Sequence, residues 1–345
     1  MPGSPFEPIR TSRLLLRAPR LEDLEALVER RNDPRVADLQ SWPTPFLAED
    51  GRALLAGAVA QGGPADGQWW MITVANPEDT DIYGDLAVHL SNAGRTAEIG
   101  FTLATEHWGG GYASEGAVAL VAYLFEEIGV SRVSGMLHPD NLAAARVLER
   151  LGMRFEGHTR LSYWVGDENS DDWLYGLTRQ GWLDWGSRPV ENPEVVELVP
   201  IDADSEAEIC RLETHKSQER LVAPVARSYA NALFPAVVDG AAVVPWMRAV
   251  RADGEWVGFM LVALTTEHHP EPYLWRLLVD RRHQRRGIGN RVLDLLVDEL
   301  SAHGDSTMTV SWAEGPGSPR PFYQRYGFDP TGNIIEGETE ARLSW

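Results

Sequence analysis

Two glycine-rich turns carry the residue types that most clearly suggest chemistry, and each stands directly before a predicted helix. They are Trp108-Gly109-Gly110-Gly111-Tyr112-Ala113 and Gln284-Arg285-Arg286-Gly287-Ile288-Gly289. Several backbone N–H groups converge at such a helix start, where the helix dipole adds positive potential. Glycine allows the backbone to approach a ligand closely because it has no Cβ. We therefore predict that both turns bind a diphosphate.

The sequence narrows the class of phosphate ligand. It contains no G-x-x-x-x-G-K-[ST] motif, which disfavours a P-loop nucleotide site. Neither turn completes G-x-G-x-x-G with an acidic residue about twenty positions later, which disfavours a dinucleotide site. Diphosphate-bearing ligands of other kinds remain open at this point.

The elements that must position the two turns occur twice. Each copy reads as strand, glycine-rich turn, helix, strand and helix, over residues 98–151 and again over residues 273–328. Gly111 stands 176 residues before Gly287, and the glycine that ends the last helix recurs after 175 residues. A separation kept over such a stretch indicates an internal repeat. The chain is therefore predicted to contain two copies of one domain.

The repeat predicts the domain boundaries. We expect a first domain over residues 1–186, a linker over 187–194 with two prolines, and a second domain over 195–345. The helix after the turn is expected over 114–128 in the first copy and over 290–303 in the second.

The composition excludes several classes of protein. The chain has 345 residues, and its single cysteine, Cys210, excludes a disulfide framework and a multi-cysteine metal site, so no metal is expected. Its formal charge of -20, from 31 Lys plus Arg against 51 Asp plus Glu, argues against a nucleic-acid partner. The apolar stretches are too short to cross a bilayer, and no signal peptide is recognised. We expect a cytoplasmic protein without a membrane partner.

The second turn belongs to a pattern known from a family. Residues 284–289 resemble the Q/R-x-x-G-x-G/A signature of the GNAT superfamily of acyl-CoA-dependent N-acyltransferases, and residues 322–328 (Phe-Tyr-Gln-Arg-Tyr-Gly-Phe) resemble its F-Y-x-x-x-G-F segment. The resemblance implies an α+β protein with two tandem GNAT folds, each a mixed, mostly antiparallel sheet flanked by helices. It also implies acetyl-CoA as the cosubstrate.

Each half resembles a different branch of the family. The first half is similar to RimJ/RimL-like acetyltransferases over residues 11–17, 108–115 and 141–148. The second half is similar to bacterial spermidine/spermine acetyltransferase-like members at Trp275-Arg276 and over residues 218–224 and 332–343.

The halves are not equally equipped for catalysis. In the family an Asn commonly contacts the cofactor, and a Tyr seven residues later commonly protonates the departing thiolate. The first half has Asn141 but then Leu148, whereas the second half has Tyr323 but Pro316 before it. Because leucine cannot donate a proton, we predict that the second half is the catalyst. The first half is then expected to bind the cofactor or to serve a structural role.

The resemblance also assigns roles in the second half. The turn at 284–289 would hold the diphosphate, and the strand edge at Leu278 and Val279 would bind the pantetheine like an added strand. An amine with a pKa near 10.4 needs about 4.6 kcal/mol to become neutral at pH 7, and a general base can supply part of this. Glu271 is our candidate base, with 267–269 as alternatives. Glu213 and Glu219 are expected to pair with a cationic acceptor.

The leading hypothesis is an N-acetyltransferase that acts on a primary amine of a small, cationic molecule. One alternative is acetylation of protein N-termini by the first domain. Another is a non-enzymatic protein that binds acyl-CoA as a sensor or scaffold. A homodimer is compatible with the sequence.

Overall fold

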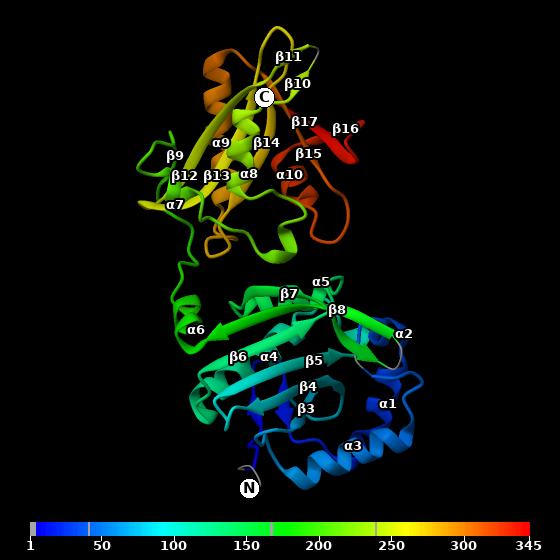
Figure 1. Ribbon diagram of the computed structural model, residues 1–345. Helices are drawn as coiled ribbons and strands as arrows, with labels where there is room; N and C mark the ends of the chain where they lie inside the picture. Colours follow the sequence, from blue (N-terminus) through cyan, green and yellow to red (C-terminus); the bar gives the residue numbers. More distant parts are fainter. Residues whose placement is uncertain (1–4, 41, 166–167, 239) are drawn as a thin grey trace. The chain divides into compact units, whose positions relative to one another are not determined.

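The computed structural model describes residues 5–40, 42–165, 168–238 and 240–345 (Figure 1). The chain divides into two compact units, Met1–Ser187 and Arg188–Trp345, called here the first and the second unit. The expected first domain begins with residues 1–4, which lie outside the described residues.

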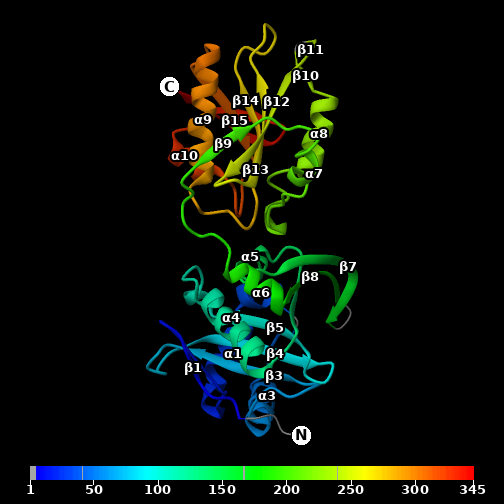
Figure 2. The same ribbon diagram turned by 90° about the vertical axis from the view of Figure 1, so that its left-hand side faces the viewer.

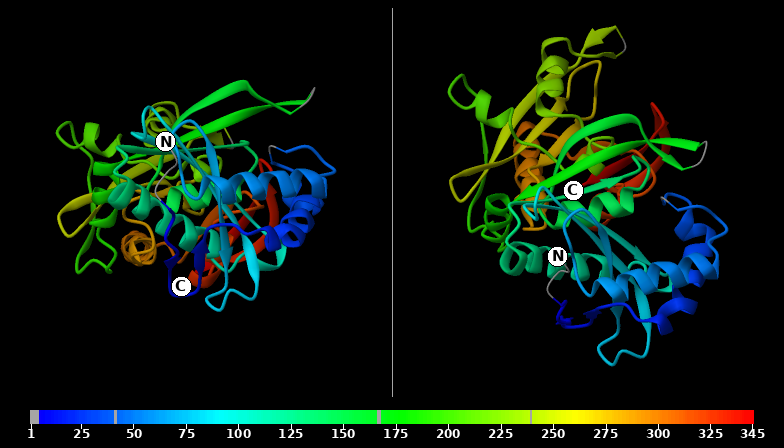
Figure 3. Two further views of the ribbon diagram at one scale, coloured as in Figure 1. Left: turned by 90° about the horizontal axis from the view of Figure 1, so that it is seen from below. Right: turned by 60° about the horizontal axis from the view of Figure 1, so that its bottom comes forward.

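The first unit is built on one eight-stranded sheet with the order β1-β2-β3-β4-β5-β6-β8-β7 (Figure 1). All neighbouring strands are antiparallel except β5 and β6, which are parallel. The strands are β1 (Ile9–Arg10), β2 (Leu15–Arg17), β3 (Trp69–Ala75), β4 (Ile82–Ser91), β5 (Thr96–Leu103), β6 (Arg132–Leu137), β7 (Arg154–Val165) and β8 (Glu168–Thr178). The β7–β8 hairpin is long and extends away from the rest of the sheet (Figure 3).

Helices cover both faces of this sheet. They are α1 (Leu24–Asn32), α2 (Pro34–Ala37), α3 (Ala48–Gln61), α4 (Tyr112–Tyr123), α5 (Leu142–Arg150) and α6 (Arg179–Gly186). Successive side chains of β3 point to opposite faces, so Trp70 and Ile72 join the core formed with α4 and α5. Met71 between them packs instead with Leu27 of α1 and Leu55 of α3.

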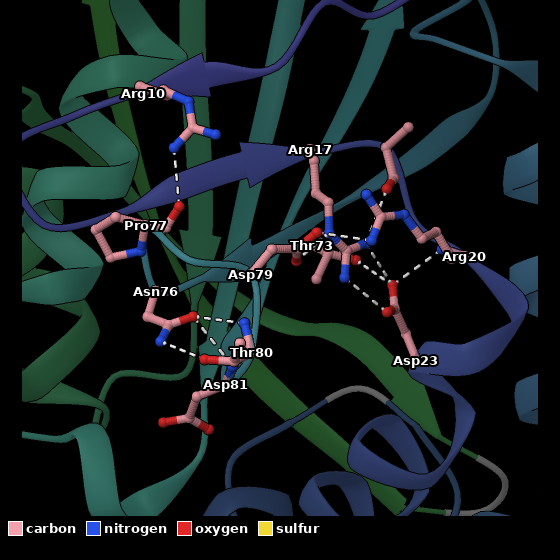
Figure 4. A network of polar contacts seen from close by, with 11 residues as sticks. Arg10, Arg17, Arg20, Asp23, Thr73, Asn76, Pro77, Asp79, Thr80 and Asp81 are labelled. Carbon is pink, nitrogen blue, oxygen red and sulfur yellow. Dashed lines mark hydrogen bonds and ion pairs between the residues drawn. The ribbon is translucent and has the colours of Figure 1, made fainter.

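A buried polar network fixes the β3–β4 turn of the first unit (Figure 4). The Arg17 guanidinium donates to Asp23 at 2.8 Å and to Asp79 at 2.6 Å, and Thr73 donates to Asp23 at 2.8 Å. Arg20 adds a second ion pair to Asp79, whose φ is 57°. Because each buried charge has a partner, the network ties the turn to β2 without an unpaired ion.

The second unit is built on a seven-stranded sheet with the order β16-β17-β15-β14-β13-β12-β9 (Figure 2). Here too the pairs are antiparallel except one, β14 with β15. The strands are β9 (Val196–Val199), β12 (Val244–Ala252), β13 (Glu255–Leu264), β14 (Tyr273–Val279), β15 (Thr307–Trp312), β16 (Asp329–Ile335) and β17 (Glu338–Ser344), with a separate hairpin of β10 (Val237–Val238) and β11 (Ala241–Ala242).

Two helical layers enclose the second sheet (Figure 2). One contains α9 (Ile288–His303) and α10 (Arg320–Tyr326), and the other contains α7 (Glu206–Ile209) and α8 (Val225–Leu233). Met260 and Val262 of β13 pack toward α9, whereas Phe259 and Leu261 pack toward α7 and α8. Both sheets thus confirm the predicted pair of mixed, mostly antiparallel sheets flanked by helices.

The helices after the two turns begin earlier than predicted. Expected from residue 114, α4 begins at Tyr112, and expected from residue 290, α9 begins at Ile288. In both cases the glycine directly before the helix is left-handed, with φ of 80° at Gly111 and 70° at Gly287. Such a φ is nearly strain-free only for glycine, so each turn passes directly into its helix.

Candidate functional site

The parallel strands of the second unit separate soon after they meet. β14 and β15 pair only at Tyr273 with Thr309 and at Leu274 with Val310, although β14 continues to Val279. On its other side β14 has a bulge at Trp275, because Leu274 and Arg276 face consecutive residues of β13. A bulge bends a strand and re-aims its side chains. The edge of β14 that faces β15 is therefore open beyond Leu274 in the described structure.

A cavity of about 180 Å³ lies at this opening. It is bounded by the edge of β14, the facing part of β15, the start of α10 and the first residue of β17. Its lining comprises Thr214, Gln218, Leu221, Val222, Leu274, Trp275, Arg276, Leu277, Leu278, Val279, Gln284, Val310, Ser311, Gly317, Pro319, Tyr323 and Glu338. Leu278, Val279, Gln284 and Tyr323, all predicted as site residues, thus meet in one cavity.

The glycine-rich turn of the second unit forms an anion cradle. Arg285 and Gly287 both have positive φ, 66° and 70°. Across the described residues, the backbone N–H groups of Arg285, Arg286 and Gly287 donate to no protein acceptor. A Cβ on Gly289 would lie 3.0 Å from the Phe322 ring, so this glycine permits α9 and α10 to approach. The cradle fits a diphosphate, because its free donors lie at a helix start.

The two arginines of the turn have different environments. Arg285 is exposed, and no ion pair involves it in the described part of the chain. Arg286 is buried, donating from Nε to the Glu191 carbonyl at 2.7 Å and lying 2.9 Å from Nδ1 of His283. Its side chain therefore holds the segment before β9. Only Arg285 keeps a guanidinium available for a phosphate.

The expected linker is bound at its second half to α9. Arg291 donates to the carbonyls of Pro193 and Glu194, at 2.6 and 3.0 Å. Gln284 is fixed in a similar way, since its amide exchanges two hydrogen bonds with Gln218 and also donates to the Val279 carbonyl at 3.1 Å. These hydrogen bonds fix the turn and the start of α9 to the neighbouring backbone.

Tyr323 is buried at the base of the cavity, with 7% of its surface exposed. Its ring stacks on Trp312 at 5.9 Å and meets Phe322 and Phe328 edge to face. Burial, followed by the nearby groups Tyr273 and Glu338, raises the pKa of the Tyr323 phenol well above its ordinary value. The phenol therefore stays protonated throughout the neutral pH range.

A chain of three polar groups, which sequence reasoning missed, lies at the cavity, and two of them, Ser311 and Glu338, line it. Ser311 donates to Glu338 in a short hydrogen bond, and the Tyr273 hydroxyl donates to Ser311 at 2.7 Å. Glu338 follows the β16–β17 turn, where the pairing of Ile335 with Glu338 closes the hairpin. No local motif marks this carboxylate, because only the hairpin register brings it beside the cavity.

The other predicted acidic residues lie elsewhere. Glu271, the candidate base, forms a two-point ion pair with Arg342, at 2.7 and 2.8 Å, and is not among the cavity residues. Its partial burial acts to raise the pKa, but hydrogen bonds from Arg342 and Thr307 outweigh that effect and hold the pKa of Glu271 below its ordinary value. A carboxylate with a lowered pKa is a weaker base.

The predicted acceptor residues also have ion-pair partners outside the cavity. Glu213 lies 3.3 Å from Arg281, and Glu219 lies 2.6 Å from Lys216. Neither carboxylate lines the cavity around Tyr323.

The first unit repeats the cradle. Gly109 and Gly111 have φ of 76° and 80°, and the N–H groups of residues 109–111 donate to no protein acceptor among the described residues. Arg13 donates to the Gly110 carbonyl at 2.9 Å and pairs with Glu115 on the first turn of α4. Trp108, Tyr112 and Ala113, also predicted here, complete this turn.

The opening between strands recurs in the first unit without its acid. β5 and β6 pair only from Thr96 to Glu98, although β5 runs on to Leu103. Asn141, predicted to contact the cofactor, accepts a hydrogen bond from the Ala144 N–H at 3.0 Å and so caps α5. Leu148 is 2% exposed and packs against Gly135 of β6. A hydrocarbon side chain therefore occupies the place where the family pattern has its phenol.

One titratable pair in the first unit was not predicted. Glu98 lies across the antiparallel ladder from His89 and beside Ser134 of the parallel neighbour. Burial raises the pKa of Glu98 above its ordinary value. His89 acts to lower this pKa, and Asp172 acts to raise it. The alternation of β5 could have suggested this group, because Ala97 and Ile99 are core residues and Glu98 points to the opposite face.

Each unit therefore combines a glycine-rich turn at a helix start with two parallel strands that separate soon after they meet. Within the described ranges, no group of three or more His, Cys, Asp or Glu side chains is arranged to hold a metal ion. No helix in those ranges combines the length and apolar character that crossing a bilayer requires.

Comparisons with known proteins identify the family. Two family models, each described as an acetyltransferase (GNAT) domain, match residues 13–154 and 246–339. The chain belongs to the GNAT acetyltransferases, with two such domains in tandem. This membership makes it an acyl-CoA-dependent N-acyltransferase.

Individual relatives match about half of the chain. The uncharacterized N-acetyltransferase YnaD of Bacillus subtilis is 28% identical over 174 residues, 50% of this chain and 98% of the relative. The FsC-acetyl coenzyme A-N(2)-transacetylase of Aspergillus fumigatus is 27% identical over 199 residues, 51% of this chain and 77% of the relative. A GNAT acetyltransferase structure from Bacillus anthracis is 28% identical, with a TM-score of 0.45 over 50% of this chain and 99% of its own.

Proposed function

We propose that the second unit transfers an acetyl group from acetyl-CoA to the primary amine of a small molecule. The observation that carries this proposal is the cavity at the opening between β14 and β15. It brings together the strand edge at Leu278 and Val279, the buried phenol of Tyr323 and the carboxylate of Glu338. Acyl transfer to an amine needs a place for the thioester, a proton acceptor and a proton donor, and these three features supply them.

The cosubstrate would be held by backbone groups. The N–H groups of Arg285, Arg286 and Gly287 would bind the diphosphate, with the exposed Arg285 guanidinium adding positive charge. The open edge of β14 would bind the pantetheine by main-chain hydrogen bonds. Acetyl-CoA supplies the acetyl group and leaves as the thiol.

Proton handling is assigned to two side chains of the cavity. Glu338 accepts the proton that the ammonium group of the acceptor must lose, and its hydrogen bond from Ser311 keeps the carboxylate in place. The neutral amine then attacks the thioester carbonyl and the C–S bond breaks. Tyr323, which burial keeps protonated, donates its proton to the leaving thiolate and regains one from the nitrogen of the new amide. Glu338 thus takes the role for which Glu271 was predicted, since Glu271 is engaged by Arg342.

The acceptor is a small amine on this proposal. With a volume of about 180 Å³, the cavity suits a compact acceptor. The predicted contacts of a cationic acceptor with Glu213 and Glu219, and the homodimer, stay predictions.

For the first unit we propose cofactor binding without catalysis, because Leu148 replaces the acid and the cradle is kept.

The proposal is tested by following thiol release from acetyl-CoA with a panel of small primary amines. We expect at least one amine to be acetylated, with the product confirmed by mass spectrometry. Tight calorimetric binding of acetyl-CoA with no thiol release from any amine or peptide would contradict the proposal and favour an acyl-CoA sensor.

The Glu98–His89 pair favours a second candidate function, acetylation of protein N-termini by the first unit. In a Tyr323→Phe background, the second unit is slowed by about 10²- to 10³-fold. Thiol release with a short peptide that has a free N-terminus reports on the first unit where adding Gly287→Val does not lower it further. If Glu98 is its base, Glu98→Gln should lower that rate about 100-fold. Because the base acts in its ionised form, the rate should also fall as pH drops through the raised pKa of Glu98.

Glu126→Gln is the control for this prediction, since Glu126 is an exposed carboxylate of the same unit. An equal loss in both variants, or a peptide rate that Glu98→Gln leaves unchanged, would exclude Glu98 as a base.

A further inference from the structure

We propose that Arg276 binds a carboxylate of the acceptor, so that the substrate is an amino-acid-like zwitterion rather than a polyamine. The inference rests on the proposed function, because it concerns the acceptor of that same cavity. It names the substrate class from the two charges that the cavity presents, Arg276 and Glu338.

The bulge of β14 gives Arg276 its position. Trp275 is the extra residue, and after it the strand resumes its ladder with Arg276 opposite Leu261. The Arg276 guanidinium lies 5.9 Å from the centre of the Trp275 ring and donates from one nitrogen to the Trp275 carbonyl at 2.6 Å. A guanidinium carries five N–H donors, so this single bond leaves most of them for a ligand.

Arg276 is a half-buried cation that has no carboxylate partner in the described structure. Among the described residues it forms no ion pair, although it is only partly exposed and lines the cavity. The buried Arg17, by contrast, is paired with Asp23 and Asp79. A partly desolvated charge without a counter-ion is costly unless a ligand supplies one. A carboxylate, which a guanidinium binds at two points, is the matching group.

Glu338 presents the opposite charge in the same cavity. Its carboxylate accepts from Ser311, and in the described structure it forms no ion pair with Arg276 or another cation. Two unpaired charges of opposite sign on one small cavity complement a molecule that carries an amine and a carboxylate close together. A polyamine would instead bring a second ammonium group near Arg276, where like charges repel.

Arg276 also lies at the reacting end of the cavity. Burial raises the pKa of both Tyr323 and Tyr273, and the positive charge of Arg276 acts in the opposite direction on both phenols. Arg276 lines the same cavity as Tyr323, Ser311 and Glu338. A carboxylate held there would place the adjacent α-amine beside Glu338.

The test compares acceptors that differ only in the carboxylate. Thiol release is measured for L-amino acids, their amides and the corresponding decarboxylated amines, with wild type and Arg276→Gln. We expect wild type to prefer the amino acids. Arg276→Gln should lower kcat/KM for the amino acids by about 30-fold, because it removes a charged hydrogen-bond pair. For the decarboxylated amines, kcat/KM should change by less than about 3-fold.

Arg248→Gln is the matched control. Arg248 lies on β12 of the same sheet, 4.2 Å from the centre of the Trp246 ring, and donates to the Met247 carbonyl, but it does not line the cavity. Arg248→Gln should leave kcat/KM unchanged for all acceptors. Arg276→Lys, which keeps the charge but not the two-point geometry, should give an intermediate loss for amino acids and serves if Arg276→Gln does not fold.

Three outcomes overturn the inference. A wild-type preference for polyamines or decarboxylated amines excludes a carboxylate site, and an equal loss for both acceptor classes in Arg276→Gln makes the residue structural. Absence of thiol release with every acceptor, while acetyl-CoA still binds, refutes the proposed function itself and the inference with it.

Discussion

Tyr323→Phe should lower kcat for amine acetylation by about 10²- to 10³-fold, the range expected for loss of a general acid. The variant keeps the ring that stacks on Trp312 and meets Phe328, so the fold and the affinity for acetyl-CoA should change little. The loss should appear at every pH in the neutral range, because burial raises the pKa of the wild-type phenol far above it. Steady-state thiol release and calorimetric titration with acetyl-CoA measure the two quantities.

Tyr326→Phe provides the control for this prediction. Tyr326 lies on the same helix, and its hydroxyl donates to Asp294 at 2.8 Å, away from the cavity. Its kcat should stay within about 2-fold of wild type, as for a surface hydrogen bond. A Tyr323→Phe enzyme that turns over as fast as the Tyr326→Phe enzyme would remove the phenol from the mechanism.

Glu338→Gln should lower kcat/KM by about 100-fold at pH 7, since the glutamine cannot accept the proton of the acceptor ammonium. The deficit should shrink as pH rises, because the neutral fraction of an amine with a pKa near 10.4 increases about tenfold per pH unit. A pH series of kcat/KM from 7 to 10 measures this rescue. The Ser311 hydroxyl can still donate to the new amide oxygen, so the cavity wall should be preserved.

Glu340→Gln is the matched variant, because Glu340 lies on the same strand and accepts from Thr331 and Asn333 outside the cavity. It should leave the pH profile unchanged. A Glu338→Gln deficit that is the same at pH 7 and pH 10 would show that the carboxylate is not a base.

Local signals made the repeat and the cradles predictable from the sequence. Both turns were recognisable from the glycines directly before a helix, and Gly111 and Gly287 lie there with left-handed φ. Tyr323 was predictable because residues 322–328 match a family pattern. The structure places Tyr323 on the short helix α10. The prediction that β14 presents an open edge at Leu278 and Val279 agrees with the short pairing of β14 with β15.

The proposed base, Glu338, was not predictable, because its place in the cavity depends on long-range register. Glu271 precedes the central strand in sequence, but its carboxylate is held by Arg342 of β17. Glu338 begins that same strand and reaches the cavity only because β17 is inserted between β15 and β16. Likewise Arg286, in a turn predicted to bind phosphate, is buried against the Glu191 carbonyl, a contact that no local pattern indicates.

Assignment of catalysis to the second unit is tested most directly by matched substitutions in the two cradles. Gly111→Val and Gly287→Val each place a β-branched residue at a left-handed helix start, with φ of 80° and 70°. The measurement is the rate of thiol release with acetyl-CoA and the preferred amine, on variants whose thermal unfolding shows both units folded. We predict that Gly287→Val lowers the rate of thiol release at least about 100-fold, and that the rate of Gly111→Val stays within about 2-fold of wild type. A loss confined to Gly111→Val would contradict the account, and so would full activity in both variants.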